Sequence, residues 1–511
     1  MTLQRCDGLR ATPLHGVSGT RLIEKSFSAL LSAHSLMQRA GQAIGQLAMA
    51  LAPHARTVWI VCGPGNNGGD GLEAAHFLHQ AAIPVKVSLL TTHQPRPVDA
   101  QAALLRAKAC GVEFTDTVPE LKEGDLIIDC LLGIGASRAP HGEMARWIDA
   151  MNQSQASILS ADQPTGLNAE TGQALMRECG APGPMVQANH TLMLLTAKPG
   201  LFMGVGRDLA GQLWLDDLCQ HDEERHVFTV ATPCSQLNTP PAPAAPRMHN
   251  SHKGSHGDVA IVGGESLRER GMGMTGAVML AASAALHAGA GRVLVSLLSA
   301  PHSTPAVEVI PEQPEWMLRN FSALDLAQLT VVCGCGGGLA VSRVLAEVLQ
   351  RSQQLVLDAD ALNAIAQDEK LAQLLKNRAS RAMPTVLTPH PLEAARLRQC
   401  ATAEIQANRL ASAHALAQQW GCTVVLKGSG TVIACPGQTS RINQSGNGKL
   451  ATAGTGDVLA GWIGAQMAQG PRTASGAFEA ACNAVFRHGH LADIWPDGQS
   501  LTASALAIRA H

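Results

Sequence analysis

The chain of 511 residues contains no tyrosine, and aromatic residues make up only 3% of it. Stacking on a planar ligand must therefore fall to very few side chains. Charged residues are also scarce, at 15%, and the net charge is −2 at pH 7. A protein that binds nucleic acid or an anionic membrane usually has an excess of positive charge, and this chain has none. We therefore expect small-molecule ligands, with no nucleic acid and no membrane as partners.

Cysteine is present, but without the spacings that metal sites need. None of the 13 cysteines forms a C-x-x-C pair, and Cys333 and Cys335 are the only close pair. Two thiols without nearby partners do not predict a zinc site. An odd number of cysteines without regular spacing favours reduced thiols in a reducing compartment. The sequence shows neither a signal-peptide pattern nor an apolar run long enough to cross a bilayer. We expect a cytoplasmic protein, and a homo-oligomer.

The length and one proline-rich segment predict two domains. A chain of 511 residues is too long for one ordinary core, and 46% hydrophobic residues are typical of a globular protein. Four prolines in 239–246 cannot donate hydrogen bonds to a helix or a sheet, which indicates a stiff extended connection. We place the first domain at 1–225 and the second at 226–511.

Predicted strands and helices alternate on both sides of this connection. Before it, strands are expected at 58–62, 85–90, 126–129, 157–161 and 191–195, with helices near 69–80, 98–110 and 142–152. After it, strands are expected at 258–262, 292–297, 330–333, 355–357, 385–388 and 423–426, with alanine-rich helices such as 276–289. Such alternation predicts an α/β fold with a doubly wound sheet in each domain.

The most informative pattern is a glycine-rich turn that ends in one carboxylate, Gly454-Thr455-Gly456-Asp457. A helix is predicted to follow, and a helix start offers unpaired N–H groups and the positive end of the dipole. Phosphate can bind at 454–456 while Asp457 works beside it as a base. The pattern predicts phosphoryl transfer to a hydroxyl group. The alternative is that Thr455 or Asp457 merely caps the helix.

Other polar residues follow predicted strands of the second domain. Lys427 opens a turn of small residues, 427–431, which lets the backbone approach a nucleotide closely. Asp358, Asp360 and His390 each lie where an apolar strand ends. Ligands bind at strand ends in open α/β sheets, so we expect these residues near one site.

Six motifs in the second half together resemble one family. They lie at 253–258, 273–277, 357–363, 388–391, 427–431 and 453–457. In this order they resemble the ADP-dependent NAD(P)H-hydrate dehydratases, which have a ribokinase-like fold. The resemblance implies that ADP phosphorylates the hydroxyl group of a hydrated NADH or NADPH, and that phosphate is then eliminated.

The same resemblance implies roles for individual residues. Asp457 would remove the hydroxyl proton, and magnesium, for which we assign no ligands, would bridge the phosphates. The implied nucleotide contacts are Lys427, Gly428, Ser429, Gly430, Thr431 and Gly456. The implied hydrate contacts are Ala277, Gly338, His390 and Asp457. One departure lies at 334–338, where Gly-Cys-Gly-Gly-Gly replaces the usual Gly-Pro-Gly-Leu-Gly and loses rigidity around Gly338.

The first half carries a separate signature after a predicted strand. Residues 63–71 read Gly-Pro-Gly-Asn-Asn-Gly-Gly-Asp-Gly, which formally contains G-x-G-x-x-G. The loop at 66–71 resembles that of the NAD(P)H-hydrate epimerases, and 129–135, 161–166 and 197–200 agree with that family. Together the two halves resemble the bifunctional NAD(P)H-hydrate repair enzymes, with a Rossmann-like epimerase domain first.

The epimerase resemblance implies a hydrate site and a potassium site. The implied hydrate contacts are Asn66, Asn67, Gly68, Gly69, Asp70, Gly133, Ile134, Gly135, Ala136, Ser137, Arg138, Ala139 and Asp162. Epimerising carbon 6 needs an ionisable group there, for which we choose Asp162, with Lys198 as a second group. Asn67, Asp129 and Thr165 offer hard oxygen ligands from three strand-end loops, which suit a large monovalent cation. The resemblance assigns potassium to them.

Two other functions stay open at this point. A small-molecule kinase of the ribokinase-like class, fused to a dinucleotide-binding module, would share the Gly-Thr-Gly-Asp turn and release a phosphorylated product. A non-catalytic protein would use the 66–71 loop only to hold a dinucleotide.

Overall fold

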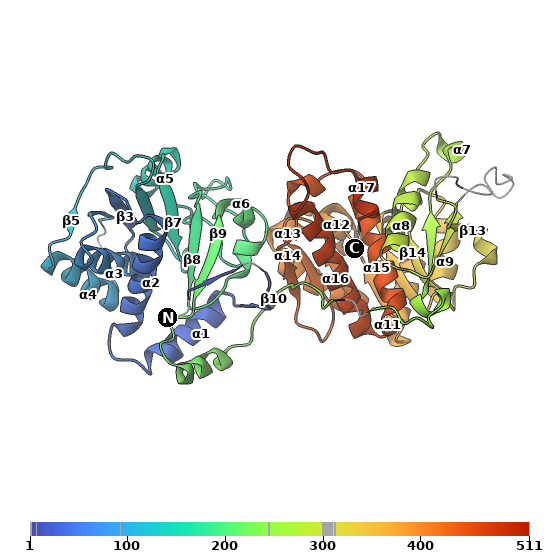
Figure 1. Cartoon of the computed structure of the whole chain (residues 1–511), viewed down its shortest axis with the longest axis horizontal. Helices are drawn as coiled ribbons and strands as arrows, with labels where there is room; N and C mark the ends of the chain where they lie inside the picture. The colour runs from blue at the N-terminus through green and yellow to red at the C-terminus, as the bar shows by residue number, and fades with distance from the viewer. Residues whose placement is uncertain are drawn as a thin grey trace. The chain divides into compact units, whose positions relative to one another are not determined.

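The computed structural model describes the whole chain except residues 1, 2, 7, 92, 93, 244, 245, 299–309, 311, 312, 510 and 511. The chain divides into two compact units, Met1–Gln236 and Leu237–His511, which Figure 1 colours from blue to green and from green to red. It passes from one to the other within strand β10 (Ser235–Leu237). The proline-rich segment 239–246 follows this point, with 244 and 245 outside the described residues. The domain boundary at 225/226 stays a prediction.

The first unit is built on one mainly parallel sheet. The strands of this sheet are β1 (Gln4–Arg5), β3 (Val58–Cys62), β4 (Val85–Leu89), β5 (Glu113–Phe114), β6 (Leu126–Cys130), β7 (Ser157–Ala161), β8 (His190–Leu194) and β9 (Gln212–Asp216). Strand β2 (Pro13–Leu14) lies outside this sheet and pairs antiparallel with β10. Its helices are α1 (Val17–Ser28), α2 (Ser35–Leu51), α3 (Asn66–Gln80), α4 (Val98–Ala109), α5 (Glu143–Gln153) and α6 (Gly206–Leu209), with 3₁₀ helices η1 (Pro199–Phe202) and η2 (Asp222–Val230). The sheet order is β1-β9-β8-β7-β6-β3-β4-β5, and only β1 pairs antiparallel.

Helices cover both faces of this sheet, so its central strands β3 and β6 are buried along their whole length. Alternate residues of β3 join two different cores, Ile60 with α2, α3 and α4, and Trp59 with α5. The strand order reverses between β3 and β6, which pair in parallel. At such a point the connections leave in opposite directions and open a crevice beyond the carboxyl ends of the strands.

The second unit repeats this architecture. Its strands are β11 (Asp258–Gly263), β12 (Arg292–Leu297), β13 (Met317–Leu318), β14 (Thr330–Cys333), β15 (Gln354–Leu357), β16 (Thr385–Leu387), β17 (Thr423–Leu426), β18 (Thr431–Ala434) and β19 (Arg441–Asn443). Its helices are α7 (Leu267–Arg270), α8 (Thr275–His287), α9 (Ser342–Arg351), α10 (Ala359–Gln367), α11 (Glu369–Ser380), α12 (Pro391–Arg398), α13 (Thr402–Ala407), α14 (Arg409–Trp420), α15 (Thr455–Gln469), α16 (Ala474–Asp493) and α17 (Ala503–Ala507). Three 3₁₀ helices complete it, η3 (Lys253–His256), η4 (Phe321–Ala323) and η5 (Gly448–Leu450).

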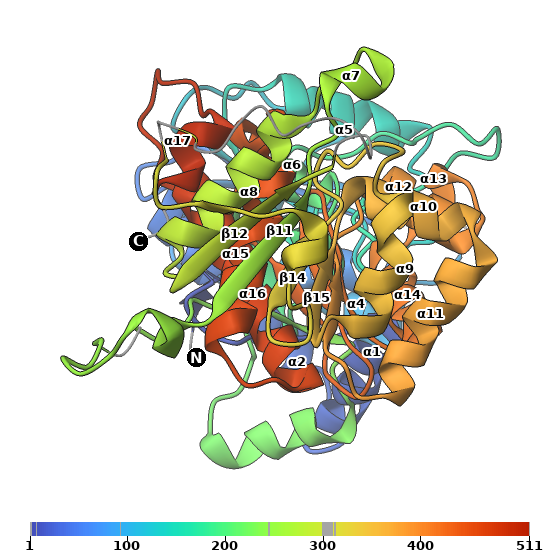
Figure 2. The same cartoon turned by 90° about the vertical axis from the view of Figure 1, so that its right-hand side faces the viewer.

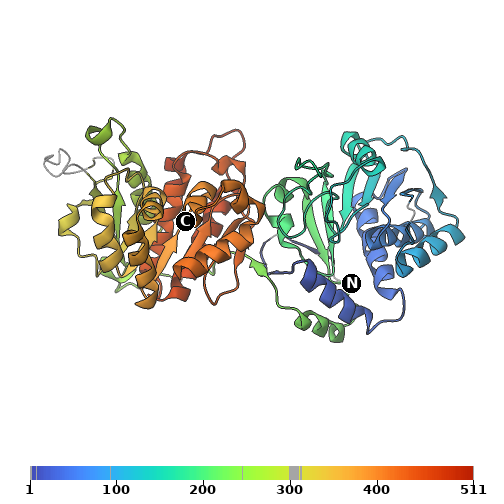
Figure 3. The same cartoon turned by 180° about the vertical axis from the view of Figure 1, so that it is seen from behind.

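The strands of the second unit follow the order β13-β12-β11-β14-β15-β16-β17-β18-β19, and the order reverses between β11 and β14. The helices α8, α15 and α16 pack on one face of this sheet. Figure 2 shows α9, α10 and α11 on the other side, and Figure 3 shows the orange helices that cover this second face. The prediction of two doubly wound α/β domains is confirmed.

Two glycine-rich motifs lie differently from the prediction. Residues 66–71 are not a loop, because α3 begins at Asn66 with Gly65 as its N-cap. The helix contains glycine there because it packs closely on the turn before it: a side chain at Gly68 would lie 2.1 Å from the carbonyl oxygen of Gly63. Likewise α15 begins at Thr455, so Asp457 lies within the first turn of the helix rather than before it.

Helices α1 and α2 were not predicted at all. The residues that precede them, Gly16 and His34, offer no side-chain cap, so the strongest sequence signal of a helix start is missing. Among the described residues, no helix has both the length and the apolar character needed to cross a membrane.

Candidate active sites

The crevice of the first unit contains a cavity of about 450 Å³ at the ends of β3 and β6. Nine of the predicted residues line it: Asn66, Asn67, Asp70, Gly133, Ile134, Gly135, Ala136, Asp162 and Lys198. Five predicted hydrate contacts do not line it: Gly68, Gly69, Ser137, Arg138 and Ala139. The two glycines serve packing instead, and Ala139 is buried. The contact roles of all these residues stay predictions.

The acid–base groups of this cavity form one pair. Lys198 is fully buried, and its Nζ contacts a carboxylate oxygen of Asp162 and donates a hydrogen bond of 2.7 Å to the carbonyl oxygen of Leu194. Asp162 has a positive φ of 67°, which a residue with a side chain rarely adopts. Nearby, burial and the negative charge of Asp162 raise the pKa of Asp70 well above its ordinary value.

Two of the predicted potassium ligands, Asp129 and Thr165, do not line the cavity, whereas the third, Asn67, does. The carboxylate of Asp129 is fully buried and accepts hydrogen bonds from the Thr165 hydroxyl (2.7 Å) and N–H (2.9 Å), the Ser160 hydroxyl (2.9 Å) and the Leu131 N–H (3.2 Å). All four donors are neutral, and burial raises the pKa of Asp129 despite them. The buried amide of Asn67 has no hydrogen-bond partner for either polar atom among the described residues.

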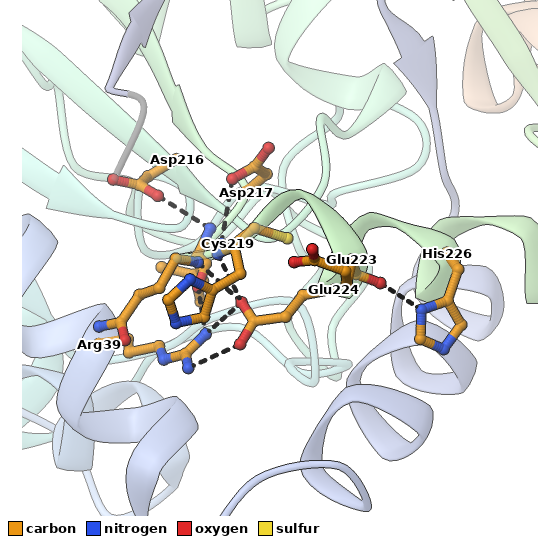
Figure 4. Close-up of polar contacts among 10 residues, drawn as sticks. Arg39, Asp216, Asp217, Cys219, Glu223, Glu224 and His226 are labelled. Carbon is orange, nitrogen blue, oxygen red and sulfur yellow. Dashed lines mark hydrogen bonds and ion pairs between the residues drawn. The ribbon is translucent and has the colours of Figure 1, made fainter.

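Sequence reasoning missed the polar network that holds one wall of this cavity (Figure 4). Arg39 of α2 donates to the carbonyl oxygen of Leu218 (2.9 Å) and to both carboxylate oxygens of Glu224 (2.8 and 3.0 Å). Leu218 follows β9 and lines the cavity. The guanidinium of Arg39 lowers the pKa of Glu224 to about 2. The network therefore ties η2 and the segment before it to α2.

We predict that Glu224→Gln lowers the free energy of unfolding at pH 7 by about 1–3 kcal/mol, the typical worth of a hydrogen bond to a charged group. The folded pKa of about 2 lies below the ordinary value of 4.5, so this stabilisation is present above pH 4.5 and is lost as pH falls towards 2. Denaturant unfolding of both proteins across this range measures the difference. Glu223→Gln, at an exposed neighbour, is the control. If the difference in unfolding free energy between parent and variant does not shrink as pH falls, the stabilising role of the Arg39–Glu224 pair is contradicted.

The second unit gathers ionisable groups at the start of α15. The thiol of Cys335 and one carboxylate oxygen each of Asp358 and Asp457 all lie within 4.8 Å of one another. Burial, and then the charge of Asp358, raise the pKa of Asp457 to about 7, whereas the thiol of Cys335 lowers it. A base with this pKa is half ionised at neutral pH, which suits proton removal from a hydroxyl group.

Lys427 connects this cluster to the glycine-rich turn after β17. Its Nζ donates a hydrogen bond of 2.8 Å to Asp358, which also accepts one of 2.8 Å from the Thr388 hydroxyl. A Cβ on Gly456 would lie 3.4 Å from the same Nζ. The structure therefore brings together Lys427, Gly456 and Asp457, three of the residues predicted for nucleotide and hydrate.

The remaining predicted hydrate contacts lie on neighbouring loops. Gly338 has φ 52° and donates its N–H to Asp360 at 2.8 Å, and a Cβ there would meet the carboxylate of Glu265 at 2.3 Å. Ala277 lies against Gly336, two residues before Gly338. His390 is the N-cap of α12: its Nδ1 accepts hydrogen bonds from the N–H groups of the first turn. This capping role was not predicted, and contact of these residues with a hydrate stays a prediction.

Two buried side chains support the site without having been predicted. Arg409 lies under the 427–431 turn and donates from Nη2 to the carbonyl oxygens of Leu426 and Lys427, at 3.1 Å each. His488 donates from Nε2 to the carbonyl oxygen of Thr455 at 2.9 Å, and burial lowers its pKa to about 4. Neither residue belongs to a motif, so no sequence signal separates them from ordinary helix residues.

Comparisons with known proteins cover both units. Residues 33–200 match the family described as YjeF-related protein N-terminus, and 259–510 match NAD(P)H-hydrate dehydratase. The bifunctional NAD(P)H-hydrate repair enzyme Nnr of Escherichia coli (strain K12) is 35% identical over 477 residues, which cover 91% of this chain and 85% of that protein. The enzyme of the same name from Coxiella burnetii is 34% identical over 480 residues, with 91% and 90% covered.

A solved structure is similar to about half of the chain. The ADP/ATP-dependent NAD(P)H-hydrate dehydratase of Bacillus subtilis, co-crystallized with ATP and Mg²⁺, is 28% identical, with a TM-score of 0.40, and the match covers 52% of this chain and 91% of that one. The two family matches fall one in each unit, 33–200 in the first and 259–510 in the second. With relatives this similar along nearly its whole length, the chain belongs to the family of bifunctional NAD(P)H-hydrate repair enzymes.

Proposed function

We propose that this chain repairs hydrated NADH and NADPH. The first unit interconverts the R and S forms of the hydrate, and the second unit dehydrates the S form at the expense of ADP. The observation that carries the proposal is the carboxyl group of Asp457, whose pKa of about 7 suits a base, at a helix start beside Lys427.

In the second unit Asp457 takes the proton of the hydroxyl group on carbon 6. The freed oxygen attacks the terminal phosphorus of ADP, and AMP leaves. Phosphate then leaves carbon 6 with its electron pair while a proton leaves carbon 5, which restores the ring double bond. The positive end of the α15 dipole and Lys427 both stabilise the charge on the transferring phosphoryl group. Magnesium, when bound, neutralises phosphate charge.

In the first unit the pair of Asp162 and Lys198 provides a proton acceptor and a proton donor within one cavity. Epimerisation at carbon 6 requires the hydroxyl group to leave one face and return to the other. This exchange needs a group that moves protons at the departing oxygen. We assign this proton transfer to Asp162 and Lys198, whose carboxylate and ammonium groups can exchange a proton with a substrate in the cavity.

Potassium fits the three predicted ligands. The amide of Asn67 is buried without a hydrogen-bond partner among the described residues, and Asp129 has neutral donors around its carboxylate. A buried amide oxygen, a carboxylate and the hydroxyl of Thr165 form a hard-oxygen set that gains from a monovalent cation. Bound potassium would supply the positive charge that Asp129 lacks in its surroundings.

One assay separates repair from the alternatives. Purified protein is added to the S form of hydrated NADH, with and without ADP, and the absorbance of reduced nicotinamide is followed. We expect full recovery of absorbance with ADP, and recovery from the R form at a rate above that of uncatalysed epimerisation. Consumption of ADP without recovery would instead indicate a small-molecule kinase. The cytoplasmic location and the homo-oligomeric state stay predictions.

A further inference from the structure

One part of the first cavity belongs to no motif. The family match begins at residue 33, yet the cavity is also lined by residues of α1: Thr20, Arg21, Glu24 and Ser28. Among these four, Glu24 alone carries an acidic group. A titratable side chain that reaches a substrate cavity from an otherwise unassigned helix is a candidate for acid–base chemistry.

Helix α1 is fixed firmly enough to position a side chain. Its first N–H, of Val17, donates to the carboxylate of Glu170 at 2.9 Å. One turn later the hydroxyl groups of Thr20 and Thr196 share a hydrogen bond of 2.7 Å in a buried position. Thr196 lies two residues before Lys198. Glu24 follows Thr20 by four residues, so both lie on the same side of α1.

The charges around Glu24 come from several elements. Asp162 and Lys198 face it from the ends of β7 and β8, Asp99 faces it from α4, and Arg21 lies on α1 itself. Asp70 of α3 also feels its charge. Burial, followed by the charge of Asp162, raises the pKa of Glu24. The cavity therefore holds one carboxylate paired with an ammonium group, Asp162, and two carboxyl groups with a raised pKa, those of Glu24 and Asp70. Of these two, Glu24 lies on the helix that no motif covers.

We propose that Glu24 is a catalytic residue of the epimerase, the acid that releases the hydroxyl group from carbon 6. The inference rests on the proposed function of the first unit. Glu24 gives its proton to the hydroxyl oxygen, the carbon–oxygen bond breaks and water leaves. The lone pair of the ring nitrogen then forms a double bond to carbon 6.

The reverse steps on the other face complete the exchange. Water adds to carbon 6, the electron pair returns to the ring nitrogen, and the surplus proton of the added water goes back to the Glu24 carboxylate. No oxidant or other reactant is consumed. Glu24 thus acts as an acid in the first step and a base in the second, beside the proton exchange proposed for Asp162 and Lys198.

The test uses the full chain and the R form of hydrated NADH without ADP. Interconversion is followed by chromatography between pH 5 and 9, and the uncatalysed rate is subtracted. For Glu24→Gln we expect kcat to fall on the order of 10²–10³-fold with KM changed only a few-fold. In the parent, the rate should fall with rising pH because the required acid loses its proton. This fall should be absent in Glu24→Gln. Glu24→Asp should keep that fall and recover part of the rate.

The matched control is Lys25→Gln, a loss of charge at the exposed neighbouring position of the same helix, which should behave like the parent. ADP-dependent conversion of the S form to NADH shows that the chain is folded. An unchanged KM of the epimerase shows that its cavity is intact. If Glu24→Gln does not fold, the pH profile of Glu24→Asp decides. A parental rate and pH profile in Glu24→Gln would overturn the role of Glu24. A parent that fails to interconvert the forms would overturn the epimerase function itself.

Discussion

Replacing Asp457 by asparagine should reduce the rate of ADP-dependent dehydration of the S form by on the order of 10²–10⁴, the usual cost of losing a positioned base. Asparagine keeps the shape of the side chain but cannot take a proton from a hydroxyl group at neutral pH. Nucleotide affinity should change little, because Lys427 and the 427–431 turn are untouched. Absorbance of reduced nicotinamide, recorded at several ADP concentrations, gives both quantities.

The pH dependence adds a second check. Since Asp457 must be ionised to act and its pKa is raised to about 7, kcat/KM of the parent should fall as pH drops below 7. The variant should lose that dependence together with its rate. Asp497→Asn, at a fully exposed side chain of the same unit, should leave both unchanged.

A purely structural Asp457 would give the opposite result. The N-cap of α15 is Gly454, so Asp457 does not occupy the capping position, and asparagine serves about as well as aspartate at helix starts. Turnover of Asp457→Asn within a few-fold of the parent would therefore return this residue to a structural role and remove the main support for the proposed dehydratase chemistry.

The second large effect is expected at Asp129. Asp129→Asn removes the one formal charge of the proposed cation cage, so bound potassium should be lost. Epimerase activity should fall by at least about 10–100-fold, the range seen when even an outer partner of a metal ligand is removed. Dehydration of the S form should persist, because the second unit has its own sheet and core. Potassium titration of epimerase activity, with bound metal measured by atomic emission, tests this.

Ser160→Ala is the matched variant for this experiment. It removes one hydrogen bond to Asp129 without changing charge, so potassium dependence should remain. Comparing the thermal unfolding of the two variants separates a weakened fold from a lost cation. An epimerase rate in folded Asp129→Asn that equals the parent at every potassium concentration would show that Asp129 serves only the local hydrogen-bond network.

Local sequence patterns were enough to predict the fold class and the positions of the motifs. Mainly apolar runs such as 58–62 and 330–333 became strands as predicted, because a strand with helices on both faces consists mostly of apolar residues. Asp457 could be proposed as a base from its turn alone, because the N–H groups at a helix start lie within a few consecutive residues. Domain number and α/β class likewise followed from length and alternation.

What the sequence could not supply depends on contacts between distant segments. Glu24 and Asp162 share a cavity, Arg39 holds Glu224, and Arg409 supports the turn at Lys427, yet no spacing along the chain relates these partners. Their proximity arises from the order of strands in each sheet, which is fixed by the burial of helix faces across the whole unit. The sequence by itself therefore determined which chemical groups and which elements this protein has, and the tertiary structure decided which groups meet.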